Sequence, residues 1–167
     1  MDRDPVITVT EEESGLTYWQ ILKGRGFSRH LLTQIKNRED GRKKRSQEGA
    51  LFSAAKAGTS FSVHIPETAP SEGILPTPMP LSIVHEDEDI LVICKPSNMP
   101  VHPSIGNYEN TLANALMAYY AKEETPFVFR CINRLDRDTS GLLLIAKNPL
   151  SGCLLAAQME NRAIRRE

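Results

Sequence analysis

Cysteines and long apolar runs are scarce in this chain. Its three cysteines, Cys94, Cys131 and Cys153, form no CxxC pair and no Cys/His spacing of the kind that binds zinc. Their odd number and wide spacing argue against a disulfide framework and predict buried free thiols in a reducing compartment. No run approaches the roughly 18 apolar residues of a membrane span, and residues 1–5 lack the apolar core of a secretion signal. We therefore expect a cytoplasmic protein that does not enter a membrane.

The chain also lacks a strong net charge, but its charge is unevenly distributed. The formal net charge of −1 gives no overall attraction to nucleic acid or membrane. Between Lys23 and Lys56, ten basic and three acidic residues leave +7, so the remaining residues sum to −8. A basic N-terminal third on a mildly acidic body indicates a surface that faces a polyanion. A solvated helix face followed by a loose basic loop explains the same charges equally well.

A proline-rich stretch, residues 69–80, is the expected boundary between two parts of an α+β protein. The part before it, residues 1–68, predicts a small N-terminal α/β module that begins and ends with a strand. Ser28 stands where an N-cap belongs, in front of apolar residues at helical spacing. The expected elements are a strand over 6–9, helices over 15–23 and 28–36, a basic polar loop over 37–49 and a strand over 60–65.

The part after the boundary, residues 81–167, predicts a mixed and mainly antiparallel sheet. Thr111 and Asn148 are the expected N-caps of two helices, and Pro149 suits a first helical position. The acidic turn 86–89 could suggest a metal site, but its successive side chains point in different directions, so we expect a solvated turn. The expected strands are a hairpin of 81–84 and 90–94, and two apolar runs over 127–132 and 142–146.

The polar chemistry is concentrated between those two apolar runs, in Asn133-Arg134-Leu135-Asp136-Arg137-Asp138-Thr139-Ser140-Gly141. Strands that deliver a tight polar turn are a common way to fix a reacting group. A plain strand connector is the simpler interpretation, since such side chains satisfy local backbone amides. Asp136-x-Asp138-x-Ser140 also begins like a calcium loop. The bidentate glutamate of that loop would fall at Lys147, and the flanks are strand-like, so we expect no metal.

The segment from Arg134 to Gly141, followed by Leu142-Leu143-Leu144-Ile145-Ala146-Lys147, closely resembles the signature of RluA-type RNA pseudouridine synthases. The resemblance implies that Asp136 is the catalytic carboxylate and that Arg134 helps to hold a flipped nucleotide. The family often has His where this chain has Asn133. Residues 83–96 and 99–103 are similar to the family's opening hairpin and Lys-Pro turn, which implies that Lys95 and His102 line an RNA-facing rim. Arg137 is a further expected RNA contact.

The N-terminal third resembles, more loosely, the S-four-like RNA-binding domain that often precedes this catalytic domain. Residues 27–32 and 56–63 carry the likeness, which makes Arg29 an expected RNA contact. The middle of that domain is replaced here by the basic run 37–48. The family's later tyrosine and later basic motif have no counterpart in these 167 residues. We therefore expect a truncated catalytic domain that is poorly active or inactive as an isolated chain.

The chemistry implied by the resemblance suits a single carboxylate. Glycoside hydrolysis uses two, one to protonate the leaving group and one to attack or to activate water. Uridine isomerisation keeps the departing uracil bound, so one ionised Asp suffices without metal or organic cofactor. Asp138, Thr139 and Ser140 are expected to shape the turn through their side chains, with Asp138 bonding turn amides or Arg137. Gly141 is expected to permit a backbone turn closed to other residues.

Two functions therefore remain open from the sequence. The first is an enzyme that acts on structured ribosomal or transfer RNA, which we expect to be a monomer. The second is a non-catalytic RNA-binding protein that keeps the fold without a completed site. Whether Asp136 attacks the sugar or removes a sugar proton is also open.

Overall fold

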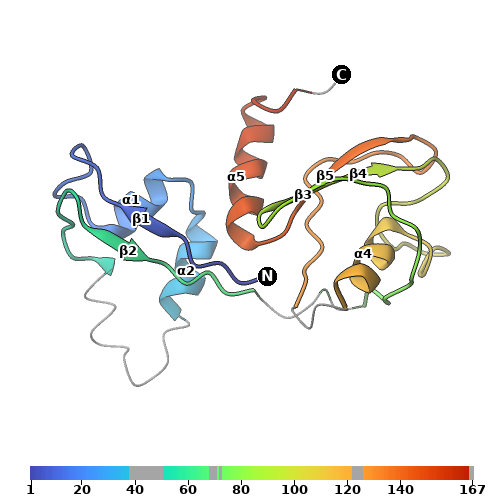
Figure 1. Cartoon of the computed structure of the whole chain (residues 1–167), viewed down its shortest axis with the longest axis horizontal. Helices are drawn as coiled ribbons and strands as arrows, with labels where there is room; N and C mark the ends of the chain where they lie inside the picture. Colours follow the sequence, from blue (N-terminus) through green and yellow to red (C-terminus); the bar gives the residue numbers. More distant parts are fainter. Residues whose placement is uncertain (38–50, 68–70, 72, 122–125, 166–167) are drawn as a thin grey trace. The chain divides into compact units, whose positions relative to one another are not determined.

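The computed structural model describes residues 1–37, 51–67, 71, 73–121 and 126–165 (Figure 1). The chain divides into two compact units, Asp2–Pro66 and Glu67–Glu167, and Met1 belongs to the second. Apart from Asn37, which ends a helix, the expected basic loop over 37–49 lies outside the described residues. The combination of helices with antiparallel strands confirms the α+β class.

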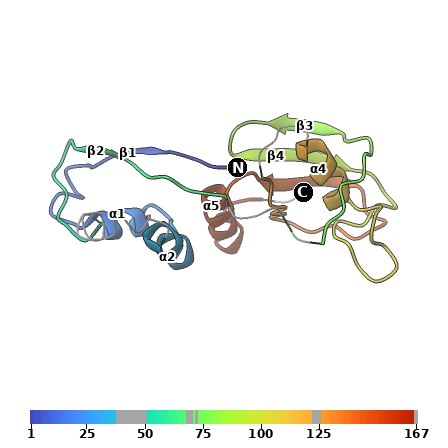
Figure 2. The ribbon, with the colours of Figure 1, turned by 90° about the horizontal axis from the view of Figure 1, so that it is seen from below.

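The Asp2–Pro66 unit is a two-stranded antiparallel sheet with two helices on one side of it (Figure 2). Strand β1 (Val6–Thr8) pairs with β2 (Ser60–Ser62), and helices α1 (Tyr18–Gly24) and α2 (Arg29–Asn37) lie between them in the sequence. Ser28 accepts a hydrogen bond from the Leu31 amide at 3.2 Å, which confirms its expected capping role. The apolar residues that the two helices bury are Ile21, Leu22, Leu31, Leu32 and Ile35.

The Glu67–Glu167 unit contains a three-stranded antiparallel sheet in the order β3-β4-β5. The strands are β3 (Ile83–Glu86), β4 (Ile90–Lys95) and β5 (Gly141–Ala146), and the first two form the expected hairpin. Helices α4 (Leu112–Tyr120) and α5 (Pro149–Glu160) begin at capping boxes formed by Thr111 and Asn148, as the sequence predicts.

The apolar core of this unit is built from α4, from the inward face of the sheet and from the loops beside them (Figure 1). Along β4 the side chains alternate, so that Leu91 and Ile93 are buried whereas Cys94 is exposed. The same alternation on β5 buries Leu143 and leaves Leu142 57% exposed. The core cluster comprises Leu91, Ile93, Val101, Leu112, Ala113, Leu116, Met117, Tyr120, Phe127, Phe129, Leu143 and Ile145.

The described part of the proline-rich stretch packs against the Glu67–Glu167 unit. The Asn114 side chain on α4 donates to the Leu75 carbonyl at 2.8 Å. The Thr77 amide donates to the Asn114 carbonyl at 3.1 Å. Leu75 and Thr77 are therefore tied to α4.

The apolar run 127–132 is not a regular strand, contrary to expectation. It approaches β5 at its end, where Cys131 bridges Ile145 and the Ile132 amide donates to the Leu144 carbonyl at 2.8 Å. Earlier in the run, the Phe129 amide donates to the Ser71 hydroxyl at 3.0 Å. The Phe129 amide therefore bonds to a side chain and does not pair with a neighbouring strand.

The prediction that all three cysteines are buried is wrong. Cys94 lies on the exposed face of β4, and Cys131 and Cys153 are half-buried. Burial raises the pKa of the Cys131 thiol to about 11. This thiol is therefore protonated, and thus weakly nucleophilic, at neutral pH.

Glu86 also departs from expectation, because it is not part of a solvated turn. Its carboxylate accepts hydrogen bonds from the Tyr119 hydroxyl at 2.9 Å, from the Tyr120 hydroxyl at 2.8 Å and from Lys147 Nζ at 2.7 Å. Burial raises the pKa of Glu86, but these bonds outweigh burial and hold the pKa below its ordinary value. Asp87 is the true turn residue, since it accepts from the Asp89 and Ile90 amides.

Among the described helices, none is long and apolar enough to cross a membrane. Within the same residues, no group of three or more His, Cys, Asp or Glu side chains is arranged to hold a metal ion.

Two neighbouring leucines on β5 test the core. Leu143→Ala should lower the free energy of unfolding by roughly 2–5 kcal/mol, because it opens a cavity in packed surroundings. Leu142→Ala, its matched control on the exposed face, should change that free energy by only about 0.5 kcal/mol. Urea denaturation of the two variants measures both, and equal losses would contradict the assignment of the two faces.

Candidate functional site

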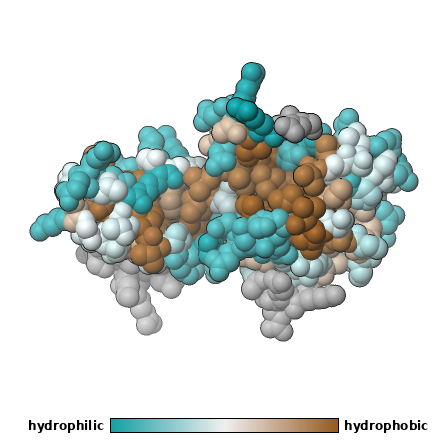
Figure 3. All heavy atoms as spheres, turned by 45° about the horizontal axis from the view of Figure 1, so that its top comes forward, coloured by the Kyte–Doolittle hydropathy of each residue, from teal (hydrophilic) through white to brown (hydrophobic). Residues whose placement is uncertain are grey.

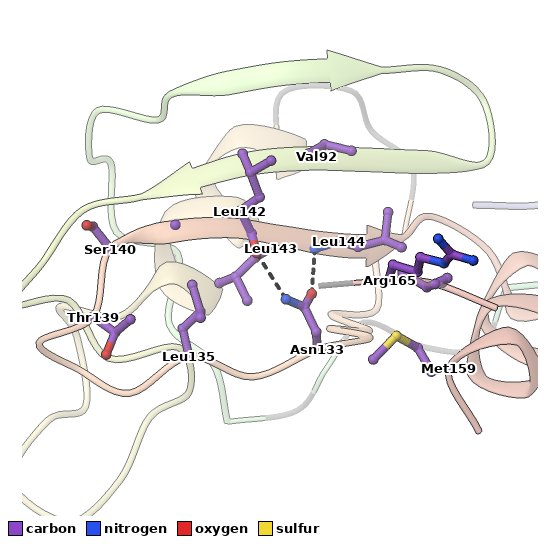
Figure 4. A pocket seen from close by; sticks show the side chains of 12 residues that line it. Val92, Asn133, Leu135, Thr139, Ser140, Leu142, Leu143, Leu144, Met159 and Arg165 are labelled. Atoms are coloured by element: carbon purple, nitrogen blue, oxygen red, sulfur yellow. Dashed lines mark hydrogen bonds between the residues drawn. The ribbon is translucent and has the colours of Figure 1, made fainter. Parts of the chain in front are cut away.

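The Arg134–Gly141 loop is fixed at its entrance by Asn133. The Asn133 side chain donates to the Leu142 carbonyl at 3.0 Å and accepts from the Leu144 amide at 2.8 Å (Figure 4). These two bonds extend the pairing of the incoming chain with β5 by one residue. At the loop exit, Gly141 adopts a φ of +151°, in a region that side chains disfavour. Both ends of the loop are therefore anchored to β5.

The Lys95 side chain fixes the Arg134–Gly141 loop by a hydrogen bond to its backbone. This side chain is fully buried at the end of β4, and its ammonium donates to the carbonyls of Pro96 at 2.9 Å, Met99 at 2.9 Å and Arg137 at 3.0 Å. Three N–H donors thus meet three acceptors, which is the full capacity of an ammonium group. Lys95 does not lie on an exposed RNA-facing rim, so the position expected from the sequence is wrong. The inward-facing register of β4 accounts for its burial.

Further hydrogen bonds join the turn after Lys95 to the loop. The Met99 amide donates to the Arg137 carbonyl at 3.1 Å, and the Ser97 hydroxyl donates to the Asp138 carbonyl at 2.8 Å. The Arg137 guanidinium donates to Asn98 Oδ1 through Nε at 3.0 Å and through Nη2 at 2.7 Å. The sequence reading missed Ser97 and Asn98. The signal for Asn98 was available, because Asn tolerates the left-handed backbone that it adopts here, with a φ of 61°.

The two acidic side chains of the loop point away from this network. Asp136 and Asp138 are both exposed, and neither carboxylate makes a hydrogen bond within the described part of the chain. The turn is closed by the main chain instead, with the Thr139 amide donating to the Asp136 carbonyl at 3.2 Å. The expected bond from the Asp138 carboxylate to turn amides or to Arg137 is therefore wrong. A rigid backbone carries two side-chain acceptors that remain available to a ligand.

The buried Lys95 ammonium places a positive charge within electrostatic reach of the two acids of the loop. Burial of its ammonium lowers the pKa of Lys95, whereas the negative charges of Asp138 and Asp136 oppose that shift. Both acids therefore interact electrostatically with a cation fixed beneath the backbone that carries them.

The positive charge of Arg134 acts on His102. Partial burial of the imidazole lowers the pKa of His102, and the positive charge of Arg134 lowers it further. The His102 ring stands edge-on to Phe129, with ring centroids 4.8 Å apart. Both residues remain exposed, so this arrangement leaves a guanidinium and an imidazole available at one end of the loop.

A groove of about 680 Å³ opens on the face of the sheet that α4 does not cover. The loop contributes Leu135, Thr139 and Ser140 to its wall, and neither Arg134 nor Asp136 is among its lining residues (Figure 4). Figure 3 shows apolar side chains exposed over the sheet and α5. The other lining residues are Val92, Asn133, Gly141, Leu142, Leu143, Leu144, Met159, Ile164 and Arg165.

Arg29 lies in the Asp2–Pro66 unit, as the exposed first residue of α2. The structure therefore brings Asp136, Arg134, Arg137 and His102 to one loop region, with Lys95 beneath it and Arg29 on a separate unit.

Comparisons with known proteins cover the loop and most of the chain. Residues 89–167 match a family model described as RNA pseudouridylate synthase. Ribosomal large subunit pseudouridine synthase D of Zymomonas mobilis is 36% identical over 170 residues, which cover 96% of this chain and 52% of that protein. The protein of the same name from Haemophilus ducreyi is 46% identical over 93 residues, covering 55% of this chain and 28% of the relative.

A third relative, the Bacillus subtilis protein named uncharacterized RNA pseudouridine synthase YjbO, is 32% identical over 141 residues. That match covers 84% of this chain and 50% of the relative. The chain spans about half the length of the two relatives that match along most of it.

Removal of the buried ammonium should loosen the loop. In Lys95→Met three carbonyls lose their donor, at a local cost of about 1–3 kcal/mol. Hydrogen exchange at the Met99 and Thr139 amides should become roughly 5- to 150-fold faster. Lys56→Met, which removes an exposed lysine from the other unit, is the control. Unchanged exchange at both amides in Lys95→Met would show that Lys95 does not hold the loop.

The proximity of Arg134 to His102 predicts a pH effect. In Arg134→Gln the pKa of His102, followed by NMR titration, should rise toward its ordinary value of 6.5 because a repelling charge is gone. The folded protein binds the His102 proton more weakly than the unfolded chain does. The contribution of His102 to stability should therefore fall as the pH drops through 6.5. Arg162→Gln is the control, in which His102 should titrate as in the parent chain. Identical His102 titration in the parent chain and in Arg134→Gln would disprove the coupling.

Proposed function

Because this chain belongs to the RNA pseudouridylate synthase family, we propose that it isomerises uridine in RNA to pseudouridine, with Asp136 as the single catalytic carboxylate. The observation that carries this proposal is the Arg134–Gly141 loop. Its backbone carbonyls accept hydrogen bonds from Lys95, Ser97 and Met99, while the Asp136 carboxylate is exposed and makes no hydrogen bond within the described residues.

An ionised carboxylate on a fixed backbone suits this reaction. The isomerisation breaks the bond between N1 of uracil and C1′ of the ribose, forms a bond from C5 to C1′, and transfers a proton from C5 to solvent while N1 gains one. The Asp136 carboxylate serves either by attack on the sugar or by removal of a sugar proton. Both routes need a free, negatively charged oxygen held close to the ribose. Neither route requires a metal ion or an organic cofactor.

Arg134 supports the proposal from two residues before Asp136. A target uridine must leave its stack to reach a catalytic side chain, which costs a few kcal/mol. An exposed guanidinium offsets part of that cost when it fills the vacated space or binds the adjacent phosphate. His102, on which the charge of Arg134 acts, is also exposed and would add a second RNA contact. Arg137 is held by Asn98 and would have to exchange that partner to contact RNA.

The substrate that we propose is structured ribosomal RNA, with transfer RNA as the alternative. Two of the relatives are named for the large ribosomal subunit. The Asp2–Pro66 unit would act as an S-four-like RNA-binding module, in which Arg29 is one contact. The proposed working form is a cytoplasmic monomer without bound metal.

A non-catalytic RNA-binding protein is the second candidate. Asp136 and Arg134 do not line the groove beside the loop, and the chain spans about half the length of its relatives. A protein with this arrangement could bind RNA through its basic unit and leave the uridine unchanged.

Release of labelled hydrogen from uracil C5 in RNA separates the two candidates. The parent chain should release it slowly, and Asp136→Asn should lower the rate by roughly 10²–10⁴-fold while RNA binding is retained. Glu109→Gln, which neutralises an exposed acid outside the loop, is the control and should keep the parent rate.

RNA binding by the parent chain with no hydrogen release above background would favour the non-catalytic candidate. Equal rates in the parent and Asp136→Asn would remove Asp136 from the catalytic role.

A further inference from the structure

Two aromatic rings stack on the surface of the Asp2–Pro66 unit. The rings of Trp19 and Phe52 lie 5.4 Å apart between centroids and are tilted by only 24° from parallel. Lys36 places its ammonium 5.6 Å from the centroid of the Phe52 ring. Trp19 is on α1, Lys36 is in the last turn of α2, and Phe52 follows in the next described segment. We call these three residues the aromatic platform.

The platform is not part of the apolar core of its unit. Phe52 is 49% exposed, which is unusual for a large aromatic side chain whose burial would stabilise a small unit. Another aromatic residue of α1 behaves differently, since Tyr18 packs edge-on against Phe61 of β2 at 4.6 Å. The Phe52 ring therefore retains accessible surface while being held by a stacked neighbour and a cation.

The platform residues Lys36 and Phe52 belong to a basic part of the sequence. Between Lys23 and Lys56 the sequence has ten basic and three acidic residues, a net charge of +7. Arg25 is neutralised by Glu13, whose carboxylate accepts its Nε at 2.9 Å and its Nη2 at 2.7 Å. A net positive charge in this part of the sequence complements a polyanion and not a neutral or cationic partner.

Proteins bind single-stranded nucleic acid through flat aromatic rings that lie within a positively charged surface. Each base offers a π-face that stacks on an aromatic ring whatever its sequence, and nearby cations bind the phosphates. A protein partner that covered an apolar patch would gain little from the surrounding cations. A duplex could not present a base face to the ring without unstacking, so an unpaired nucleotide is the occupant that fits.

We propose that the aromatic platform binds an unpaired nucleotide of the RNA substrate, with the base stacked on Phe52 and an adjacent phosphate on Lys36. This proposal rests on the RNA-directed function proposed above and adds a contact site on the unit that does not carry Asp136. The site is sequence-tolerant, because it reads a base face and a phosphate.

The chain carries its own probe, because Trp19 is its only tryptophan. Single-stranded oligouridine should quench the Trp19 fluorescence of the full 167-residue chain as it binds. Binding is measured in parallel by the anisotropy of labelled RNA. Phe52→Leu keeps apolar bulk without the ring and should weaken binding roughly 5- to 100-fold, whereas Phe52→Tyr keeps the ring and should bind like the parent.

Two substitutions of Lys36 test the proposed phosphate contact. Lys36→Gln should reduce the slope of log affinity against log salt by about 0.7, the value for one phosphate contact on a single strand, and Lys36→Arg should preserve the slope. Tyr108→Leu removes another exposed aromatic residue, on the unit that carries Asp136, and should leave binding unchanged. Unfolding midpoints equal to that of the parent confirm that each variant is folded.

Four outcomes would overturn the proposal. RNA binding without Trp19 quenching, or equal binding by Phe52→Leu and the parent, would exclude the platform and leave the role of Asp136 untouched. No binding of RNA by the folded chain would contradict both the platform and the proposed function. Quenching by an apolar peptide but not by oligouridine would make this surface a protein contact.

Discussion

The candidate site depends on one buried cation. The Lys95 ammonium has no exposed surface and satisfies its three donors with carbonyls from both the turn that follows β4 and the Arg134–Gly141 loop. A buried ammonium that lost one of these acceptors would be strongly unfavourable, so the turn and the loop are held in one relative arrangement. The position of the Asp136 backbone follows from that constraint.

The main chain of the loop makes the hydrogen bonds that fix it, and its two acidic side chains stay exposed. Most of the bonds that fix it use backbone carbonyls or amides, including those of Arg137, Asp138 and Thr139. The carboxylates of Asp136 and Asp138 are left exposed on this fixed support. An enzyme needs this combination, because a reacting group must be held in place without its reactive atoms being consumed by structural bonds. A plain strand connector would instead use those acids to satisfy the turn.

Local signals predicted much of this architecture. The caps at Ser28, Thr111 and Asn148 and the β3–β4 hairpin follow from short patterns, because they depend on neighbouring residues alone. Burial of Lys95 was also encoded, since Leu91, Ile93 and Lys95 occupy alternate positions of one strand, whereas the resemblance to the family's Lys-Pro turn implied an exposed position. Glu86 could not be assigned from sequence. Its partners Tyr119, Tyr120 and Lys147 are distant along the chain and meet only in the fold.

The most direct test of the catalytic role of Asp136 is a structure of the chain bound to RNA that contains the target uridine. We expect a flipped uridine whose ribose lies about 3–3.5 Å from a carboxylate oxygen of Asp136, the approach that a reacting pair requires. The loop should be unmoved above the buried ammonium of Lys95. A uridine bound in the apolar groove along β5, with the Asp136 carboxylate turned to solvent, would contradict the account.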